Sequence, residues 1–360
     1  MKREKERKSM GGFGRYLAMD IGAANAVVGE PGRGVVLRGR AAVMTTALDK
    51  RVLAVGDEAW NAHERTPDNL AVCRPLAAPC DFDVLTPLLA FFRQKANPSG
   101  FIVRFLGIRP RALFAVPPCA TAFERRAYAD AARAAGFSLA DCGVALVDET
   151  LAHAVGTGLW RRPPGCSAAL VVGARCCHAA VFSDGEVALS RCIHSRTPLL
   201  GAGGDAMDAA IVEFFERESG LVVGTEYAER IKRSAGVSPA SGGYGEVEPP
   251  PGCKMSVSQA AAGVRDAMSA PLARLCAMFG ELLEDAAREL GDGALSEIAD
   301  GGVMLSGGGA QLRGLDNLLR DKFKMPFTLA ERPLDSAVDG MLEMIASGRI
   351  PALEVEATKR

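Results

Sequence analysis

Two segments of the chain repeat one pattern, and this repetition limits the folds that the chain can adopt. From Tyr16 the sequence YLAMDIGAANAVVG has an apolar run, a stretch of small residues around Gly22, and a second apolar run. This pattern predicts a β-hairpin with a tight glycine turn. A similar layout begins at Ser167 with SAALVVGARCCHAAVFSDGEV, about half the chain away. Two such hairpins indicate an internal duplication, and a length of 360 residues agrees with two lobes.

Each hairpin is followed by sequence in which strand and helix patterns alternate. Residues 111–117 (RALFAVP) predict a buried strand, and residues 121–137 predict an Ala/Arg-rich amphipathic helix that ends near Gly136. In the second half, residues 205–220 predict a helix closed by glycine. Residues 303–323 predict a strand, a glycine turn and a helix. The chain is therefore expected to have an α/β fold.

Composition places the chain among globular proteins. Apolar residues make up 48% and charged residues 24%, with 42 Lys and Arg against 43 Asp and Glu, and this balance gives no indication of nucleic-acid binding. No stretch approaches ~20 uninterrupted apolar residues, so no transmembrane helix is expected. The beginning of the chain lacks the continuous apolar segment of a signal peptide. The adjacent Cys176 and Cys177 do not have the spacing of zinc ligands.

The N-terminal residues 1–15 form a separate basic segment. Residues 2–8 carry five basic and two acidic side chains. Two interpretations stay open. The segment is a solvated tail, or it is a basic tether to anionic lipid, to which each cation would contribute roughly 1 kcal/mol near the surface.

Three glycine turns stand where backbone amides can face a ligand. Residues 20–22 (DIG) end the first strand, where a carboxylate either holds hydrated Mg²⁺ or caps a turn. Residues 203–205 (GGD) open a helix, which fits a ligand turn or an ordinary helix cap. Residues 307–309 (GGG) lie between an apolar strand and an amphipathic helix. Each turn alone is weak evidence, but their joint arrangement in two hairpin-led halves favours a ligand.

A series of short fragments runs through nearly the whole chain, from Tyr16 to about Ile345. In order they are DIGAAN, GVVL, RTPDN, RPL, DFD, AVP, ATAFERRA, DETLAHAVGTGL, GAGGDAMDAAI, AERIK, SGGGAQLRGLD and ERPLDSAV. Their order and approximate spacing resemble the MreB family of bacterial rod shape-determining proteins. The fragments RTPDN, RPL and DFD before ATAFERRA look more like MreB than like chaperone ATPases or plasmid-segregation actins.

The resemblance implies an actin-like fold, that is, a duplicated ribonuclease H-like α/β fold with two lobes and a nucleotide cleft between them. On this basis residues 16–160 form the first lobe and residues 161–335 the second. Residues 336–360 are expected to form a helix that returns to the first lobe, followed by a tail. The implied cofactor is ATP or ADP with Mg²⁺.

The resemblance also implies roles for individual residues. Asp20 would organise Mg²⁺ through water. Glu124 would orient the attacking water, although without the resemblance it is an ordinary member of a solvated helix face. Glu229 is expected at the ribose. The residues expected to contact the nucleotide are Gly22, Ala23, Ala24, Asn25, Gly173, Arg175, Gly203, Gly204, Asp205, Glu229, Arg230, Ile231, Lys232, Gly307, Gly308, Gly309 and Ala310.

The second hairpin departs from the family pattern. Where the family reads DIGGGTTE, residues 171–178 read VVGARCCH, and only Gly173 is retained. Val171 replaces a carboxylate that would share Mg²⁺ and the attacking water, and loss of a positioned acid or base typically costs ~10²–10⁴ in rate. ATP hydrolysis is therefore in doubt. Arg175 either neutralises phosphate in place of a metal or points outward. Zinc is not expected at residues 176–178, because consecutive strand residues alternate faces.

One further segment suggests a membrane contact. Residues 101–111 (FIVRFLGIRPR) lie where the family has a membrane-inserting loop. Phe101, Ile102, Phe105 and Leu106 would enter lipid while neighbouring arginines face the headgroups. An edge strand that enters the core through these apolar residues is equally compatible with the pattern.

The resemblance implies a cytoplasmic protein, peripheral at the inner face of the cell membrane, that binds adenine nucleotide, polymerises and helps to determine rod cell shape. Its expected partners are further copies of itself, an MreB-type paralogue, membrane proteins of the rod complex and of cell-wall synthesis, and the membrane surface, with no nucleic acid. The alternative is a hydrolysis-deficient actin-like scaffold that acts through protein–protein contacts.

Overall fold

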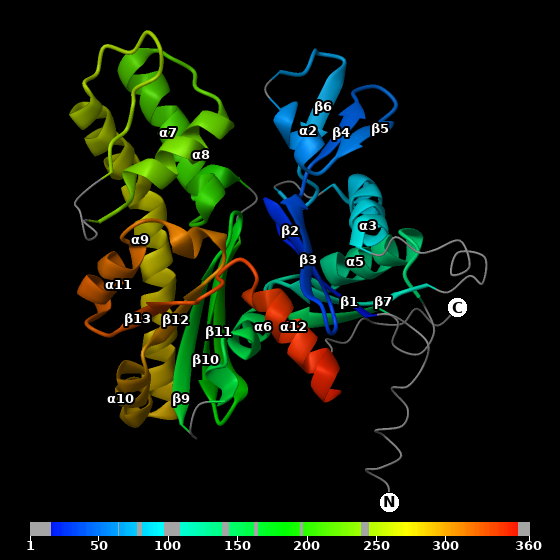
Figure 1. The fold of residues 1–360 in the computed structure, drawn as a ribbon. Helices are drawn as coiled ribbons and strands as arrows, with labels where there is room; N and C mark the ends of the chain where they lie inside the picture. The colour runs from blue at the N-terminus through cyan, green and yellow to red at the C-terminus, as the bar shows by residue number, and fades with distance from the viewer. Residues whose placement is uncertain are drawn as a thin grey trace, which may run out of the picture. The chain divides into compact units, whose positions relative to one another are not determined.

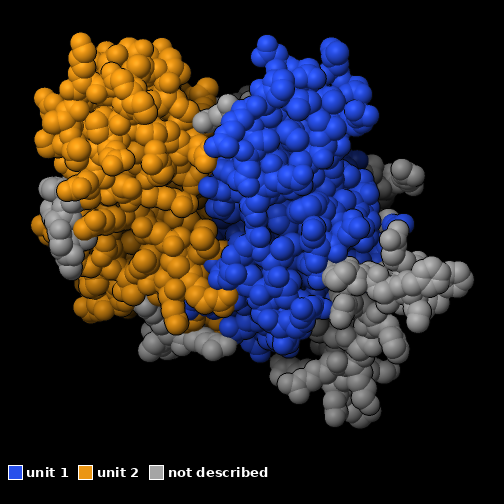
Figure 2. All heavy atoms as spheres, turned by 45° about the horizontal axis from the view of Figure 1, so that its top comes forward, with its two compact units in different colours: residues 1–157, 335–360 blue, residues 158–334 orange. Residues whose placement is uncertain are grey.

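The chain divides into two compact units. A computed structural model describes residues 16–63, 65–77, 81–96, 109–138, 144–161, 165–194, 197–238 and 245–351. Unit 1 comprises residues 1–157 and 335–360, and unit 2 comprises residues 158–334 (Figure 2). The basic segment 1–15 and the predicted membrane residues Phe101, Ile102, Phe105 and Leu106 lie outside the described residues.

Unit 1 is built on a five-stranded sheet (Figure 1). Its strands are β1 (Tyr16–Ile21), β2 (Asn25–Glu30), β3 (Gly34–Arg40), β7 (Arg111–Val116) and β8 (Val144–Asp148). Their order is β3-β2-β1-β7-β8. The first three strands are antiparallel neighbours, whereas β7 and β8 continue the sheet in parallel with β1. The apolar runs that predict strands are buried, with Leu17, Met19 and Phe114 inaccessible to solvent.

Helices and a small second sheet complete unit 1. The helices are α2 (Asp57–Asn61), α3 (Phe82–Ala96), α5 (Ala122–Ala134), α6 (Glu149–Gly156) and α12 (Ser336–Ser347), and the small sheet has the strands β4 (Val43–Thr46), β5 (Val52–Val55) and β6 (Leu70–Cys73). Although α6 and α12 are far apart in sequence, they pack against each other (Figure 1). A Cβ atom added at Gly156 would lie 1.9 Å from the Ser336 carbonyl oxygen, and one added at Gly340 would lie 1.9 Å from the Ala152 oxygen. Glycine at both positions lets the two helix backbones touch.

Unit 2 repeats the sheet of unit 1. Its strands are β9 (Cys166–Val172), β10 (Cys176–Ser183), β11 (Glu186–His194), β12 (Val303–Ser306) and β13 (Phe327–Leu329). Their order is β11-β10-β9-β12-β13, again an antiparallel three-stranded half continued by two parallel strands. The two sheets have one topology, which confirms the duplication predicted from the two hairpins.

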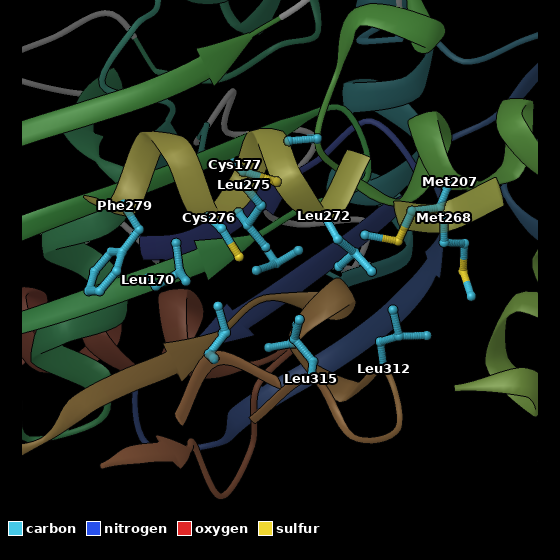
Figure 3. Packing of buried hydrophobic residues seen from close by; sticks show 14 of the residues in the cluster. Leu170, Cys177, Met207, Met268, Leu272, Leu275, Cys276, Phe279, Leu312 and Leu315 are labelled. Carbon is cyan, nitrogen blue, oxygen red and sulfur yellow. The ribbon is translucent and has the colours of Figure 1, made fainter. Parts of the chain in front are cut away.

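The helices of unit 2 surround one large apolar core. They are α7 (Gly204–Ser219), α8 (Thr225–Ala235), α9 (Val257–Leu290), α10 (Asp292–Gly301) and α11 (Leu315–Phe323), with short 3-10 turns η1 (Leu159–Arg161), η2 (Pro198–Leu200) and η3 (Gly308–Gln311). Figure 3 shows Leu275 and Phe279 of α9 among the buried side chains of this cluster, together with Leu170 of β9. Helix α9 continues through Pro271. Pro271 is buried, and packing of the surrounding apolar face offsets the lost backbone hydrogen bond.

Among the described residues, the helices are either too short or too polar to cross a bilayer.

Candidate functional site

The first hairpin makes a tight turn at residues 22–25. The Gly22 amide donates a hydrogen bond to the Asn25 carbonyl at 2.9 Å, and the Ala24 carbonyl accepts one from the Ala41 amide at 3.0 Å. A Cβ atom on residue 22 would lie 3.3 Å from the Asn25 oxygen, so glycine keeps this turn unstrained. The four predicted contact residues Gly22, Ala23, Ala24 and Asn25 form this turn and are half-buried.

Asp20 lies near the carboxyl end of β1, level with the end of β8. In the parallel sheet Asp20 pairs with Ala115 of β7, which pairs with Val147 of β8. Helix α6 begins two residues later at Glu149, and His153 follows one turn along it. One carboxylate oxygen each from Asp20 and Glu149 and one ring nitrogen of His153 lie within 4.8 Å of one another. The register of the sheet thus gathers two carboxyl groups and an imidazole in unit 1.

The electrostatics of this group favour a cation. Burial, and after it the neighbouring charge of Glu149, hold the pKa of Asp20 well above its usual value. Two carboxylates this close and partly desolvated are stabilised by a shared proton or by a bound cation. Oxygen ligands of this kind suit a divalent ion such as Mg²⁺. Asp20 and Glu149 therefore fit the cation that the sequence predicts at Asp20.

The second hairpin closes with the same hydrogen bond as the first. The Gly173 amide donates to the Cys176 carbonyl at 3.0 Å, which corresponds to the bond from Gly22 to Asn25. Ala174 and the half-buried Arg175 complete the turn. The two units therefore carry equivalent turns at the equivalent edge of their sheets.

The start of α7 is hydrogen-bonded to this second turn. The Gly173 carbonyl accepts from the Gly204 amide at 3.0 Å, and the Ala174 carbonyl accepts from the Asp205 amide at 2.8 Å. A Cβ atom on Gly203 would lie 2.4 Å from the Ala174 oxygen, so only glycine fits there. These two amides of α7 hold the hairpin in place instead of facing an anion.

The triple glycine packs against the end of β9. Gly307 has φ +85°, and a Cβ atom added to it would lie 2.6 Å from the Val172 carbonyl oxygen. A Cβ atom on Gly309 would lie 2.6 Å from Cγ1 of the same valine. The Gly307 amide donates to the Pro333 carbonyl at 3.0 Å. These glycines are thus required by a close backbone approach to the strand that carries the second hairpin.

A buried ion pair fixes the glycine turn of α7 to α8. Lys232 Nζ lies 2.8 Å from the Asp208 carboxylate and donates to the Gly204 carbonyl at 3.1 Å. Burial raises the pKa of Asp208 to about 6, although the charge of Lys232 acts in the opposite direction. The Lys232 side chain therefore ties the first turn of α7, at Gly204, to α8.

Comparison with known proteins assigns the chain to a family. The model of the family "MreB/Mbl protein" matches residues 14–350. The chain is 31% identical to the cell shape-determining protein Mbl of Bacillus subtilis over 338 residues, which cover 91% of this chain and 95% of Mbl. It is also 31% identical to the cell shape-determining protein MreB of Escherichia coli over 357 residues, covering 94% and 96% of the two chains.

The chain belongs to the MreB/Mbl family. Its fold is actin-like, as in the crystal structure of MreB5 of Spiroplasma citri bound to AMPPNP, which matches with a TM-score of 0.79 at 20% identity and covers 94% of this chain and 98% of MreB5. The same protein bound to ADP matches with a TM-score of 0.76 at 21% identity, covering 94% and 98%. The MamK double helical filament matches with a TM-score of 0.73 at 16% identity, covering 94% and 99% of the chains.

Within this MreB/Mbl fold, the predicted residues at the start of α7 and in the triple glycine contact the second hairpin or the end of β9. The other predicted residues of unit 2 have different neighbours. Glu229 forms an ion pair with Arg233 at 2.9 Å, one turn along α8. The Arg230 guanidinium lies 5.0 Å from the centre of the Tyr227 ring. Ile231 and Ala310 are buried in the core of unit 2, whereas Gly308 is exposed.

Glu124 has a structural partner in its own helix. Its carboxylate accepts hydrogen bonds from the Thr121 amide at 2.9 Å and the Thr121 hydroxyl at 3.0 Å, and the Thr121 side chain accepts from the Glu124 amide. This reciprocal pair is a capping box at the start of α5. In the described part of the chain, the acidic group beside Asp20 is Glu149.

Sequence reasoning missed Glu149, His153 and Asp208. Asp148 and then Glu149 follow the apolar run of residues 144–147. Since the carboxyl ends of parallel strands meet at one edge of a sheet, the proximity of Glu149 to Asp20 could have been predicted. Asp208 carries no sequence signal beyond its place in a helix, because its burial against Lys232 depends on the packing of α7 on α8.

The second hairpin has the same turn hydrogen bond as the first, but position 171 carries no carboxyl group. Val171 is fully buried in β9, where it pairs with Ser306 of β12. Its Cγ1 lies 3.1 Å from the Cβ position of residue 307. The position at which the family pattern has a carboxylate therefore holds an apolar side chain that packs beneath the triple glycine.

Proposed function

We propose that this chain is a cytoskeletal cell-shape protein that binds an adenine nucleotide with Mg²⁺ and assembles into filaments with copies of itself. The proposal rests on the pair of equivalent hairpins, each closed by the same hydrogen bond at the same edge of a five-stranded sheet. It is supported by relatives that are named cell shape-determining proteins and by related structures that hold AMPPNP or ADP or form a filament.

Under this proposal the residues divide into three roles. The glycine turns at residues 22–25, 173–175 and 307–309 bring bare backbone close to the phosphates and the adenosine. Asp20 and Glu149 hold the cation, and bound Mg²⁺ supplies neutralising charge for the phosphates. The Lys232 ammonium group donates a hydrogen bond to the Gly204 carbonyl and so positions the turn at the start of α7.

Glu149 takes the water-orienting role in this proposal in place of Glu124. Glu149 lies beside Asp20, whereas the carboxylate of Glu124 is engaged in the capping box of α5. A positioned acid or base contributes ~10²–10⁴ in rate, so its removal is readily measured.

A second candidate function is a scaffold that binds nucleotide without hydrolysing it. The observation that favours it is the buried Val171 at the position of the family carboxylate. An apolar side chain there cannot hold a metal-bound water or accept a proton. The scaffold would keep the fold and act through contacts with proteins.

Nucleotide affinity and phosphate release test these two functions together. We expect tight binding of an adenine nucleotide in the presence of Mg²⁺. In the ATPase case, Glu149→Gln lowers phosphate release by at least ~10²-fold, while the matched change Glu124→Gln leaves it unaltered. Binding without release supports the scaffold. Absence of nucleotide binding by a folded, monodisperse chain would refute both. Sedimentation of the nucleotide-bound chain measures filament formation in the same samples.

We also propose that the chain contacts the membrane through residues 101–106 and the basic segment 1–15. The supporting pattern is the alternation of aromatic and aliphatic residues with arginines in FIVRFLGIRPR. Co-sedimentation with anionic vesicles measures this contact. Phe105→Asp with Leu106→Asp is expected to abolish lipid binding, and unchanged binding would remove the segment from the proposal.

A further inference from the structure

The group formed by Asp20, Glu149 and His153 contains more than the carboxylates needed for Mg²⁺. His153 lies on the same face of α6 as Glu149, one turn later, and its side chain is 2% exposed. Its Nε2 lies 3.8 Å from a Glu149 carboxylate oxygen. An imidazole nitrogen therefore faces the same small space as the two carboxyl groups.

Ser336 orients the imidazole. His153 Nδ1 and Ser336 Oγ are 2.8 Å apart, across a contact between α6 and α12 that joins residues 183 positions apart in sequence. With Nδ1–H donating to the hydroxyl oxygen, Nε2 carries the lone pair on the side of Glu149. Metal-binding histidines show this arrangement, in which the second ring nitrogen donates to a fixed acceptor that sets the tautomer and the ring orientation.

The spacing of the three ligand atoms suits one ion. They all lie within 4.8 Å of one another. Ligands at about 2.0–2.2 Å from a metal are held no more than about 4.4 Å apart, so side-chain movements of under about 1 Å close the group around an ion. A cation also offsets the repulsion between the carboxylates of Asp20 and Glu149, whose oxygens lie within 4.8 Å of each other.

The ligand set distinguishes between classes of ion. Mg²⁺ prefers oxygen ligands and retains several waters. Mixed carboxylate and imidazole ligands instead suit Mn²⁺, Fe²⁺ and Zn²⁺. We propose that Asp20, Glu149 and His153 bind a divalent transition-metal ion directly, through two carboxylate oxygens and imidazole Nε2. This inference deepens the proposed function, on which it rests for the presence of a cation at Asp20, but it requires no nucleotide.

Manganese is the appropriate probe, because the ten cysteines of the chain would compete for softer ions such as Zn²⁺. The experiment titrates the full chain with Mn²⁺ in nucleotide-free, Mg²⁺-free buffer and measures free Mn²⁺ by electron paramagnetic resonance. Pulsed measurements on the bound ion then detect a directly coordinated imidazole through its ¹⁴N modulation. We expect one tightly bound Mn²⁺ per chain with a nitrogen signal in the unmodified protein.

Substitutions identify the ligand. His153→Gln is expected to weaken Mn²⁺ binding by at least about 10–100-fold and to remove the nitrogen signal. Ser336→Ala, which leaves the imidazole in place but releases Nδ1, is expected to weaken binding by about 10-fold. His63→Gln is the matched control, because His63 belongs to the same unit but stacks on Trp60 instead, and it should change neither measurement.

The inference would be overturned by three results: no bound Mn²⁺ in the unmodified chain, a bound ion without nitrogen modulation, or modulation that survives His153→Gln. The nitrogen signal is measured on the unmodified protein, so the inference can be refuted even if His153→Gln fails to fold. Separate nucleotide titration keeps the two proposals distinguishable. Bound Mn²⁺ with a nitrogen signal in a chain that fails to bind nucleotide would support this inference and refute the proposed function.

Discussion

The contact between α6 and α12 offers a sharp test of how unit 1 is held together. In Gly340→Ala the new Cβ atom would lie 1.9 Å from the Ala152 carbonyl oxygen and 2.7 Å from the Gly156 nitrogen. Both atoms are helix backbone and cannot rotate away. Since real Cβ contacts are essentially never shorter than 3.0 Å, the helices must separate by about 1 Å.

The expected cost follows from what α12 buries. Val338, Met341, Met344 and Ile345 are between 0% and 6% exposed. Full burial of such side chains is worth about 1.5–3 kcal/mol each, and a gap of 0.5–1 Å forfeits about a quarter to a half of the dispersion attraction. The loss across four side chains is about 2–5 kcal/mol. Alanine gains about 1 kcal/mol over glycine in helix propensity, which leaves a net destabilisation of about 1–4 kcal/mol.

Tryptophan fluorescence isolates the affected unit. The chain has two tryptophans, Trp60 in unit 1 and Trp160 in unit 2. In a Trp160→Phe background, urea unfolding followed through Trp60 therefore reports on unit 1. Gly340→Ala should strongly lower the urea concentration at the midpoint of unfolding of unit 1.

Gly293→Ala in α10 is the control for this test. No atom lies within 4 Å of its added Cβ, so the change should leave unit 2 unaltered or stabilise it by up to about 1 kcal/mol. Its midpoint is read through Trp160 in a Trp60→Phe background. Equal, small effects of the two substitutions would refute the close helix contact.

Three further predictions concern the glycine turns, the buried ion pair and the helix cap. Gly203→Ala should destabilise unit 2 by about 1–3 kcal/mol, because its Cβ would meet the Ala174 carbonyl oxygen at 2.4 Å. Gly204→Ala should cost clearly less, because the nearest atom to its Cβ is the flexible Lys232 Nζ at 3.3 Å. Urea unfolding followed through Trp160 compares the stability of the two variants. Asp208 has a folded-state pKa of about 6 against an ordinary value of 3.8, so the stability linked to its protonation is present below pH 3.8 and is lost as the pH rises through 6, by about 3 kcal/mol. Compared with Asp208→Asn, the unmodified chain should lose about 2.4 kcal/mol of this amount in urea unfolding between pH 4 and pH 7, and parallel profiles would contradict the assignment. Glu124→Ala should cost about 0.5–1 kcal/mol through loss of the capping box, measured by Trp60 unfolding, with no loss of nucleotide binding.

The hairpins and the order of strands and helices could be predicted because their signals are local. An apolar run, a glycine turn and a second apolar run specify β1 with β2 within residues 16–30, and β9 with β10 within residues 166–183. The need for Gly22 is also local, because a Cβ atom there would meet the Asn25 oxygen of the same turn at 3.3 Å. Gly203 and Gly307 are instead required by contacts with Ala174 and Val172, which lie far away in sequence.

The group around Asp20 has no local signal and follows from the order of the strands and from contacts between residues far apart in sequence. Glu149 joins it only because β1, β7 and β8 are neighbours in one parallel sheet, and His153 is oriented by Ser336, 183 residues away. Glu124 illustrates the opposite difficulty. The family resemblance suggests a role in chemistry, whereas the residues Thr121 and Glu124 also spell a capping box that needs no ligand.

Glycine motifs in this chain therefore carry less functional information than the polar residues beside them. Gly203, Gly307 and Gly309 are each required by atoms of unit 2 itself, at distances of 2.4–2.6 Å from an added Cβ. They would be needed even in a chain that binds no nucleotide, because a side chain would separate the hairpin, α7 and the triple glycine. Val171 shows that the acid can be absent while this scaffold of contacts persists. The chemistry must accordingly be judged from groups that packing does not require, and the strongest of these is the pair of carboxyl groups, Asp20 and Glu149, held together against their own repulsion.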